Sequence, residues 1–113
     1  MSSGTRSRIR RENAYAPMLS GMAVNPPSGN QSTNFAFSVI YTDLDNNQPS
    51  SIAVVINGSL YPLSKVTIAD NTYVDGCVYS RTMTLAPGCH VYYFSATDGK
   101  FTTSTLSART SSR

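Results

Sequence analysis

Charged side chains are scarce in this chain. Asp, Glu, Lys and Arg make up 13% of its 113 residues, about half the share that is usual in soluble globular proteins. Between residues 21 and 108 three basic residues stand against five aspartates, whereas four arginines lie between residues 6 and 11. We therefore expect a mildly acidic domain with basic ends, whose surface of Ser, Thr, Asn and Tyr repels other proteins weakly and packs against them well.

Groups for acid–base chemistry are almost missing. His90 is the single histidine and Glu12 the single glutamate, so a histidine triad or a pair of histidine metal ligands cannot form within one chain. No pattern in the sequence pairs a nucleophile with a base. We expect no catalytic residue, no enzymatic activity and no cofactor, and we interpret His90 as a partly buried side chain beside a turn.

Long apolar runs are also missing. No run approaches the roughly 18–20 residues that a membrane-crossing helix needs, which excludes such a span. The start of the chain lacks the apolar stretch of a secretory leader, because the arginines between 6 and 11 lead directly into Glu12 and Asn13. The expectation is a protein made inside a cell, where disulfides are rare.

Cys77 and Cys89 are the only cysteines, and we expect both thiols to be free. Residues 77–96 are predicted to form one hairpin that turns at Ala86–Cys89, with the cysteines at opposite ends of a strand. At about 3.3 Å per residue the strand separates them by roughly 30 Å, whereas bridged Cα atoms lie within about 7 Å. The alternative is a bridge to another molecule.

Alternating apolar and polar residues predict strands. Phe35, Phe37, Val39 and Tyr41 alternate with smaller or more polar residues, which is the period of a strand with one buried face. Asn57-Gly58 between two β-rich runs favours a two-residue type I′ hairpin, and Pro62 then limits the second run to an edge strand.

The predicted fold is all-β, a β-sandwich of about seven short strands. In the 77–96 hairpin the core face is expected to carry Tyr79, Met83, Leu85, Tyr92, Phe94 and Ala96, with His90 near the turn. A last turn at Asp98–Lys100 returns the chain toward Leu106. The domain is expected over 21–108, after an extended basic arm over 1–20 and before a short basic tail over 109–113.

One short run has the alternating oxygen ligands of a calcium loop. Asp43, Asp45 and Asn47 form D-x-D-x-N, but the glycine and the terminal glutamate of an EF-hand loop are missing. A metal site is therefore not predicted, and these residues are a calcium candidate beside the simpler interpretation of a solvated turn whose side chains bond their own backbone.

The basic arm is the main candidate for binding a partner. Arginines bind carboxylates and phosphates through their forked donors, so the candidate set is Arg6, Arg8, Arg10 and Arg11, with Tyr15 close by. A nucleic-acid binder usually extends its basic surface over the folded domain, whereas this domain is mildly acidic. A groove on a protein is favoured over nucleic acid, and a disordered terminus is the plain alternative.

The stretch from Phe37 to Asp98, about two-thirds of the chain, resembles a known class of domain. The motifs are Phe35-x-Phe37-x-Val39-x-Tyr41-x-Asp43-x-Asp45, then Val54-x-Ile56-Asn57-Gly58, then Tyr73-x-x-Gly76-x-x-Tyr79, and finally Leu85-x-x-Gly88-x-His90-x-Tyr92-x-Phe94-x-Ala96-x-Asp98-Gly99. They resemble the immunoglobulin-like modules of large bacterial and archaeal surface proteins and of phage virion proteins. The resemblance implies an immunoglobulin-like sandwich and an architectural role, and it says little about function in detail.

These expectations combine into one functional hypothesis. The chain is expected to be a structural protein of a bacteriophage virion, a capsid decoration or cement protein that is made in the host cytoplasm. Its partners would be the major capsid protein and copies of itself, in a homo-oligomer or larger assembly, without nucleic acid or membrane. The alternative is an extracellular carbohydrate- or protein-binding module from a larger secreted surface protein.

Overall fold

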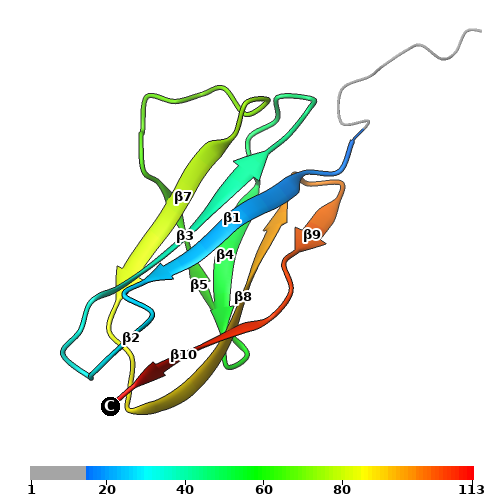
Figure 1. Ribbon diagram of the computed structural model, residues 1–113. Coiled ribbons are helices and arrows are strands. Elements are labelled where there is room, and N and C mark those ends of the chain that lie inside the picture. The colour runs from blue at the N-terminus through cyan, green and yellow to red at the C-terminus, as the bar shows by residue number, and fades with distance from the viewer. Residues whose placement is uncertain (1–14) are drawn as a thin grey trace, which may run out of the picture.

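The computed structural model describes residues 15–113, which form two β-sheets packed against each other (Figure 1). Sheet A has the strand order β1-β3-β7-β6, and its strands are β1 (Met18–Asn25), β3 (Phe35–Thr42), β7 (Cys77–Met83) and β6 (Ser64–Lys65). Sheet B has the order β2-β10-β8-β4-β5, and its strands are β2 (Ser28–Gly29), β10 (Ala108–Ser112), β8 (Gly88–Thr97), β4 (Ser51–Ile56) and β5 (Ser59–Pro62). β9 (Thr102–Ser104) pairs with β8. The prediction of an all-β fold is confirmed. None of the described residues belongs to a helix that could span a bilayer.

The core lies between the two sheets and is rich in aromatic residues. Alternate residues of β3, from Phe35 to Tyr41, are fully buried, as the period of two predicts. β8 supplies Tyr92 and Phe94 from the opposite sheet, and the rings of Phe37 and Tyr92 meet edge to face at 5.3 Å between centroids. Contacts of this geometry add to the gain from burial, so aromatic packing joins the two layers.

The hairpin predicted around Asn57-Gly58 is confirmed. β4 and β5 pair antiparallel with Ile56 opposite Ser59, and Asn57 and Gly58 have φ angles of 52° and 87°, which is the type I′ pattern. β5 is an edge of sheet B, as Pro62 requires.

The predicted hairpin over residues 77–96 is wrong. β7 pairs with β3 and β6, whereas β8 pairs with β4, β9 and β10, so the two strands lie in different sheets. The segment between them crosses from sheet A to sheet B. The inward face was nevertheless placed correctly, because Tyr79, Leu85, His90, Tyr92, Phe94 and Ala96 are buried and Met83 packs on the core.

Both cysteines are free: Cys77 is buried in sheet A and Cys89 is exposed in sheet B. Their separation comes from the two sheets, and not from the length of one hairpin.

The sandwich also extends past its predicted ends. β1 begins at Met18, within the segment expected to be arm, and β10 continues to Ser112, within the expected tail. β10 is held at its end by a short parallel pairing with β2, and the Arg113 N–H donates to the Gly29 carbonyl at 2.8 Å.

Candidate functional site

Of the residues predicted to bind a partner, the structure describes only Tyr15, which lies at one end of the sandwich (Figure 1). Arg6, Arg8, Arg10 and Arg11 lie outside the described residues. Tyr15 has a side chain that is 56% exposed, and its N–H donates to Asp45 Oδ2 at 2.8 Å. The chain therefore enters the sandwich beside the loop that joins β3 to β4.

The calcium candidate forms a turn that is tied to the core. Asp43 is fully buried, its Oδ1 accepts from the Asp45 N–H at 2.8 Å and its Oδ2 accepts from the Tyr41 hydroxyl at 3.1 Å. The same hydroxyl also lies 3.0 Å from the Asn47 carbonyl. Residues 15–113 contain no group of three His, Cys, Asp or Glu side chains that could hold a metal. Asp43 bonds the backbone two residues on, as the simpler interpretation expected, but the turn is not solvated at this residue, because Asp43 is buried.

His90 is part of a hydrogen-bonded link between hairpin and core. Asn57 Oδ1 accepts from the Val91 N–H at 3.0 Å, which fixes the amide so that Nδ2 faces His90 Nδ1 at 2.7 Å. Nδ1 must then accept, so the ring carries its proton on Nε2, which donates to the Ala86 carbonyl at 2.7 Å. Both ring nitrogens thus have structural partners.

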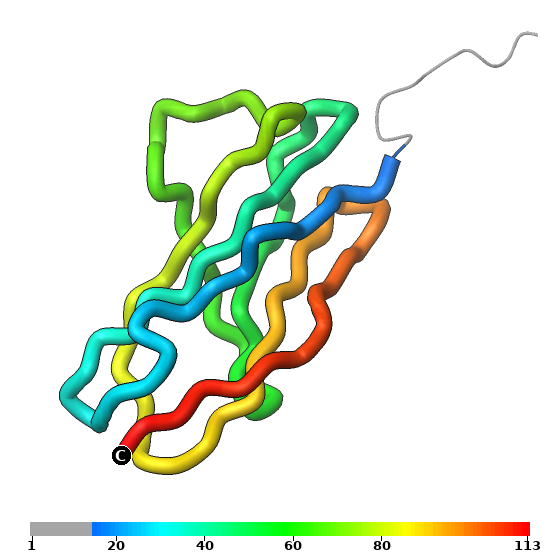
Figure 2. The backbone as a smooth tube through the Cα atoms, in the orientation of Figure 1, coloured from blue at the N-terminus to red at the C-terminus, as the bar shows by residue number. Residues whose placement is uncertain are grey.

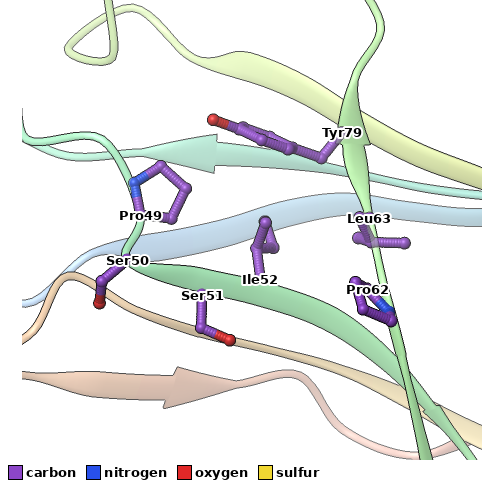
Figure 3. A pocket seen from close by; sticks show the side chains of 7 residues that line it. All are labelled: Pro49, Ser50, Ser51, Ile52, Pro62, Leu63 and Tyr79. Atoms are coloured by element: carbon purple, nitrogen blue, oxygen red, sulfur yellow. The ribbon is translucent and has the colours of Figure 1, made fainter.

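A hollow of about 310 Å³ opens between the sheets at the start of β4. Figure 3 shows Ile52 between Pro49 and Leu63, with the ring of Tyr79 above them. The Ser50 hydroxyl in the lining donates to the Thr97 carbonyl at 3.2 Å. Burial raises the pKa of the Tyr79 hydroxyl, which also belongs to the lining. The hollow suits an apolar group and offers no base that could activate a reaction.

The outer face of sheet A carries no charged side chain among the described residues. Core residues of β3 and β7 alternate with outward ones, so the outward set follows from the register. It consists of Met18, Ser20, Ala23, Asn25, Ala36, Ser38, Ile40, Thr42, Ser64, Val78, Ser80 and Thr82. The sequence has no charged residue between positions 13 and 42. This face was not predicted, because outward positions become neighbours only when the strand pairing is known.

The outer face of sheet B is nearly as neutral. Val55 lies between Leu60 of β5 and Tyr93 of β8, and Leu60 is 60% exposed. Among the described residues of this face, only Arg109 of β10 is charged, opposite Val91.

Most of the charged groups lie in the loops instead. Figure 2 shows the segments 43–50, 66–76 and 98–101 at the end of the sandwich where β1 begins. All the aspartates of the chain lie in these loops, namely Asp43, Asp45, Asp70, Asp75 and Asp98. Lys65 is held there too, with Nζ bonded to the Asp70 carbonyl at 2.8 Å and to the Tyr73 hydroxyl at 3.0 Å. The domain is therefore acidic at one end, uncharged on the described outer face of sheet A and nearly uncharged on that of sheet B.

The buried thiol is no candidate nucleophile. Burial and the nearby charge of Asp70 raise the pKa of Cys77, so the reactive thiolate is disfavoured.

No protein family model matches this chain, and no curated protein sequence matches it either.

Proposed function

We propose that this chain is a non-enzymatic structural protein of a virion, a phage decoration or cement protein that binds the assembled capsid shell through its N-terminal arm and a face of the sandwich. The observation that carries the proposal is the separation of charge. Among the described residues the outer face of sheet A has no charge and that of sheet B has only Arg109, the aspartates are gathered in loops at one end, and the chain enters the sandwich at that end after four arginines in the sequence.

Neutral faces suit packing in an assembly. Burying a charge without a partner is costly, and these faces have almost none to bury. The arginines of the arm can bind carboxylates of a shell subunit by paired hydrogen bonds. When arm and face bind together, each raises the effective concentration of the other, so two weak contacts hold one copy firmly.

The strand order supports an immunoglobulin-like form of the sandwich. In such domains one sheet has the order A-B-E-D and the other contains C, F and G. The orders β1-β3-β7-β6 and β5-β4-β8-β10 fit this scheme with β5 in the place of C′. Domains of this architecture serve many unrelated purposes, so the order supports the fold and leaves function to the surfaces.

The test is binding to empty shells assembled from the major capsid protein of the same virus. The full chain is titrated against shells by co-sedimentation, and hydrogen exchange is followed over residues 1–30 with and without shells. We expect saturable binding and new protection in residues 1–14. A variant with Arg6, Arg8, Arg10 and Arg11 all changed to Gln should bind about tenfold more weakly or worse. Absence of saturable binding by the unchanged chain would reject the proposal.

The hollow beside Ile52 favours a second candidate, a binding module for carbohydrate or protein. Its lining joins Tyr79 and two prolines to the hydroxyls of Ser50 and Ser51, which is the mixture of apolar surface and few polar groups found in ligand pockets. NMR titration with soluble oligosaccharides tests it. Saturable shifts confined to this lining would support the module, and their absence at millimolar sugar would reject a glycan site.

A further inference from the structure

We propose that the outer face of sheet A, at the end where β1 begins, is the surface that docks on the shell. The docking strip is defined as Met18, Ile40, Val78 and Val66. Its partner is an apolar patch on a shell subunit with carboxylates around it. This inference rests on the proposed function and deepens it, because it assigns the face, the residues and the chemistry of the partner.

The strip lies across β1, β3 and β7 and continues just past the end of β6. Ile40 of β3 lies opposite Val78 of β7, and Met18 of β1 lies opposite Thr42, the next outward residue of β3 after Ile40. The Val66 N–H donates to the Val78 carbonyl at 2.9 Å, which continues the row past the end of β6. Val78 is 41% exposed and Val66 is 58% exposed. Exposed aliphatic side chains therefore flank the half-buried Ile40 on a face that has no charge among the described residues.

Two glycines let the middle of the strip lie flat. A Cβ atom on Gly21 would lie 2.9 Å from Ile40 Cδ1, and one on Gly76 would lie 2.9 Å from Ile40 Cγ2. The Ile40 side chain therefore rests against the backbone on both sides. A partner surface can approach this part of the sheet closely, because no side chain of either glycine stands above it.

The place where the arm joins the domain identifies the partner. Met18 belongs to the strip, and residues 1–14 precede Tyr15, three positions before it. At about 3.3 Å per residue, Arg11 can reach roughly 13 Å from Tyr15 and Arg6 roughly 30 Å. The arginines can therefore reach the surroundings of the strip, so a complementary surface has an apolar centre and acidic surroundings.

Two other occupants fit less well. A second copy packed face to face on the same strip would bring two sets of four arginines into one seam, and like charges oppose such a pairing. The chain's own arm offers little apolar surface to cover the strip, since residues 1–14 contain only Met1, Ile9 and Ala14 as apolar side chains. A shell subunit whose carboxylates face the arm, and not the aspartates of the loops, meets neither objection.

The test compares matched valines on the two faces. Val78 on sheet A and Val91 on sheet B are 41% and 40% exposed, so Val78→Asp and Val91→Asp make the same change at equal exposure. The full chain carrying each variant is titrated against empty shells after its melting temperature has been measured. We expect Val78→Asp to weaken binding at least about tenfold, because it buries a carboxylate against an apolar patch. Val91→Asp should stay within about twofold.

A milder variant keeps the test decisive if the aspartate disturbs the strand. Val78→Thr preserves shape and strand preference while it replaces a methyl group by a hydroxyl, and it should weaken binding by about fourfold. Unchanged binding by Val78→Thr and Val78→Asp, or a larger loss in Val91→Asp, would overturn the docking strip while shell binding itself stands. No binding by the unchanged chain would overturn both proposals. A change in oligomeric state caused by Val78→Asp without shells would instead assign the strip to contacts between copies.

Discussion

At the scale of single residues, the Asn57 amide holds the β4–β5 hairpin against β8. Its Nδ2 donates to Nδ1 of the buried His90, which is the acceptor in this link. An aspartate at position 57 keeps the acceptor for the Val91 N–H and loses the donor. The loss of folding stability in Asn57→Asp therefore equals the free-energy cost of leaving His90 Nδ1 buried without its hydrogen bond.

Asn57→Asp should lower the free energy of unfolding by about 1–3 kcal/mol at pH 8. Asn46→Asp is the matched control, because Asn46 also has a positive φ and acts as an acceptor, for the Tyr73 N–H at 2.7 Å. An aspartate keeps that acceptor, so the control should be nearly neutral. Urea unfolding of both variants measures the difference, and equal losses would contradict the assigned roles of the two amides.

Gly76 is required both by its backbone and by its neighbour. Gly76→Ala meets a φ of +94° and a contact of 2.9 Å with Ile40, whereas Gly58→Ala meets a φ of +87° with nothing within 4 Å. The unfavourable φ should cost each variant about 1–2 kcal/mol, and the contact should add about 1–3 kcal/mol to Gly76→Ala alone. Thermal unfolding separates them. Equal melting temperatures would show that Ile40 moves aside freely.

At the scale of the elements, buried tyrosines make stability depend on alkaline pH. Burial, chiefly, raises the pKa values of Tyr41 in β3, Tyr79 in β7 and Tyr92 in β8. Unfolded tyrosines ionise near pH 10, so above that pH the unfolded chain binds fewer protons than the folded one. The contribution of the protonated tyrosines to the free energy of unfolding is complete below about pH 10 and is lost as pH rises further.

The free energy of unfolding should therefore fall above pH 10, by at most about 1.4 kcal/mol per pH unit for each of these tyrosines. Urea unfolding between pH 8 and pH 11 gives the slope. Tyr79→Phe should reduce the slope by about one quarter, since it removes one of four groups with a raised pKa, the three tyrosines and the Cys77 thiol. A free energy of unfolding that is constant over this range would argue that the rings ionise inside the fold.

The elements differ in how far the sequence predicts them. The hairpin at Asn57-Gly58 could be predicted, because a type I′ turn needs two positive φ angles that this pair provides. The reversal at Pro87-Gly88 could not be assigned, because a hairpin and a crossing between two sheets have the same alternation and the same turn residues. Only the strand partners, β3 for β7 and β4 for β8, distinguish them.

β1 and the docking strip were missed for related reasons. The register of β1 on β3 shifts between Ser20 and Ala23, so Leu19 and Val24 face the core out of phase and the period of two is interrupted. Ile40 and Val78 stand at outward positions on strands 38 residues apart in sequence. Nothing local marks them as neighbours. The arginines of the arm could be chosen as binding candidates from the sequence, because a dense cluster of charges is recognisable without knowledge of the fold.

At the scale of the whole molecule, the arm and the sandwich should act independently in stability and together in binding. The core is built from residues 35–96, with partly buried residues of β1 and β10 packed on it. Removing residues 1–14 should therefore change the melting temperature by less than about 2 °C.

The same truncation should remove the salt dependence of shell binding. Contacts between arginines and carboxylates are screened by salt, whereas apolar contact is not. Affinity of the full chain should fall between 50 mM and 300 mM NaCl, and affinity of the truncated chain should be weaker and nearly constant. Co-sedimentation at several salt concentrations measures this. A salt dependence that survives truncation would mean that other charges make the contact.

The two ends of the described chain lie at opposite ends of the sandwich (Figure 1). β1 begins at the end with the acidic loops, and the C-terminal end of β10 lies far from it beside β2. A fluorescent protein or an antigen joined after Arg113 would therefore lie far from a partner bound by the arm. The distance between them would be roughly the length of an eight-residue strand, about 27 Å. This geometry makes the C-terminus the attachment point for cargo that must remain accessible outside a particle.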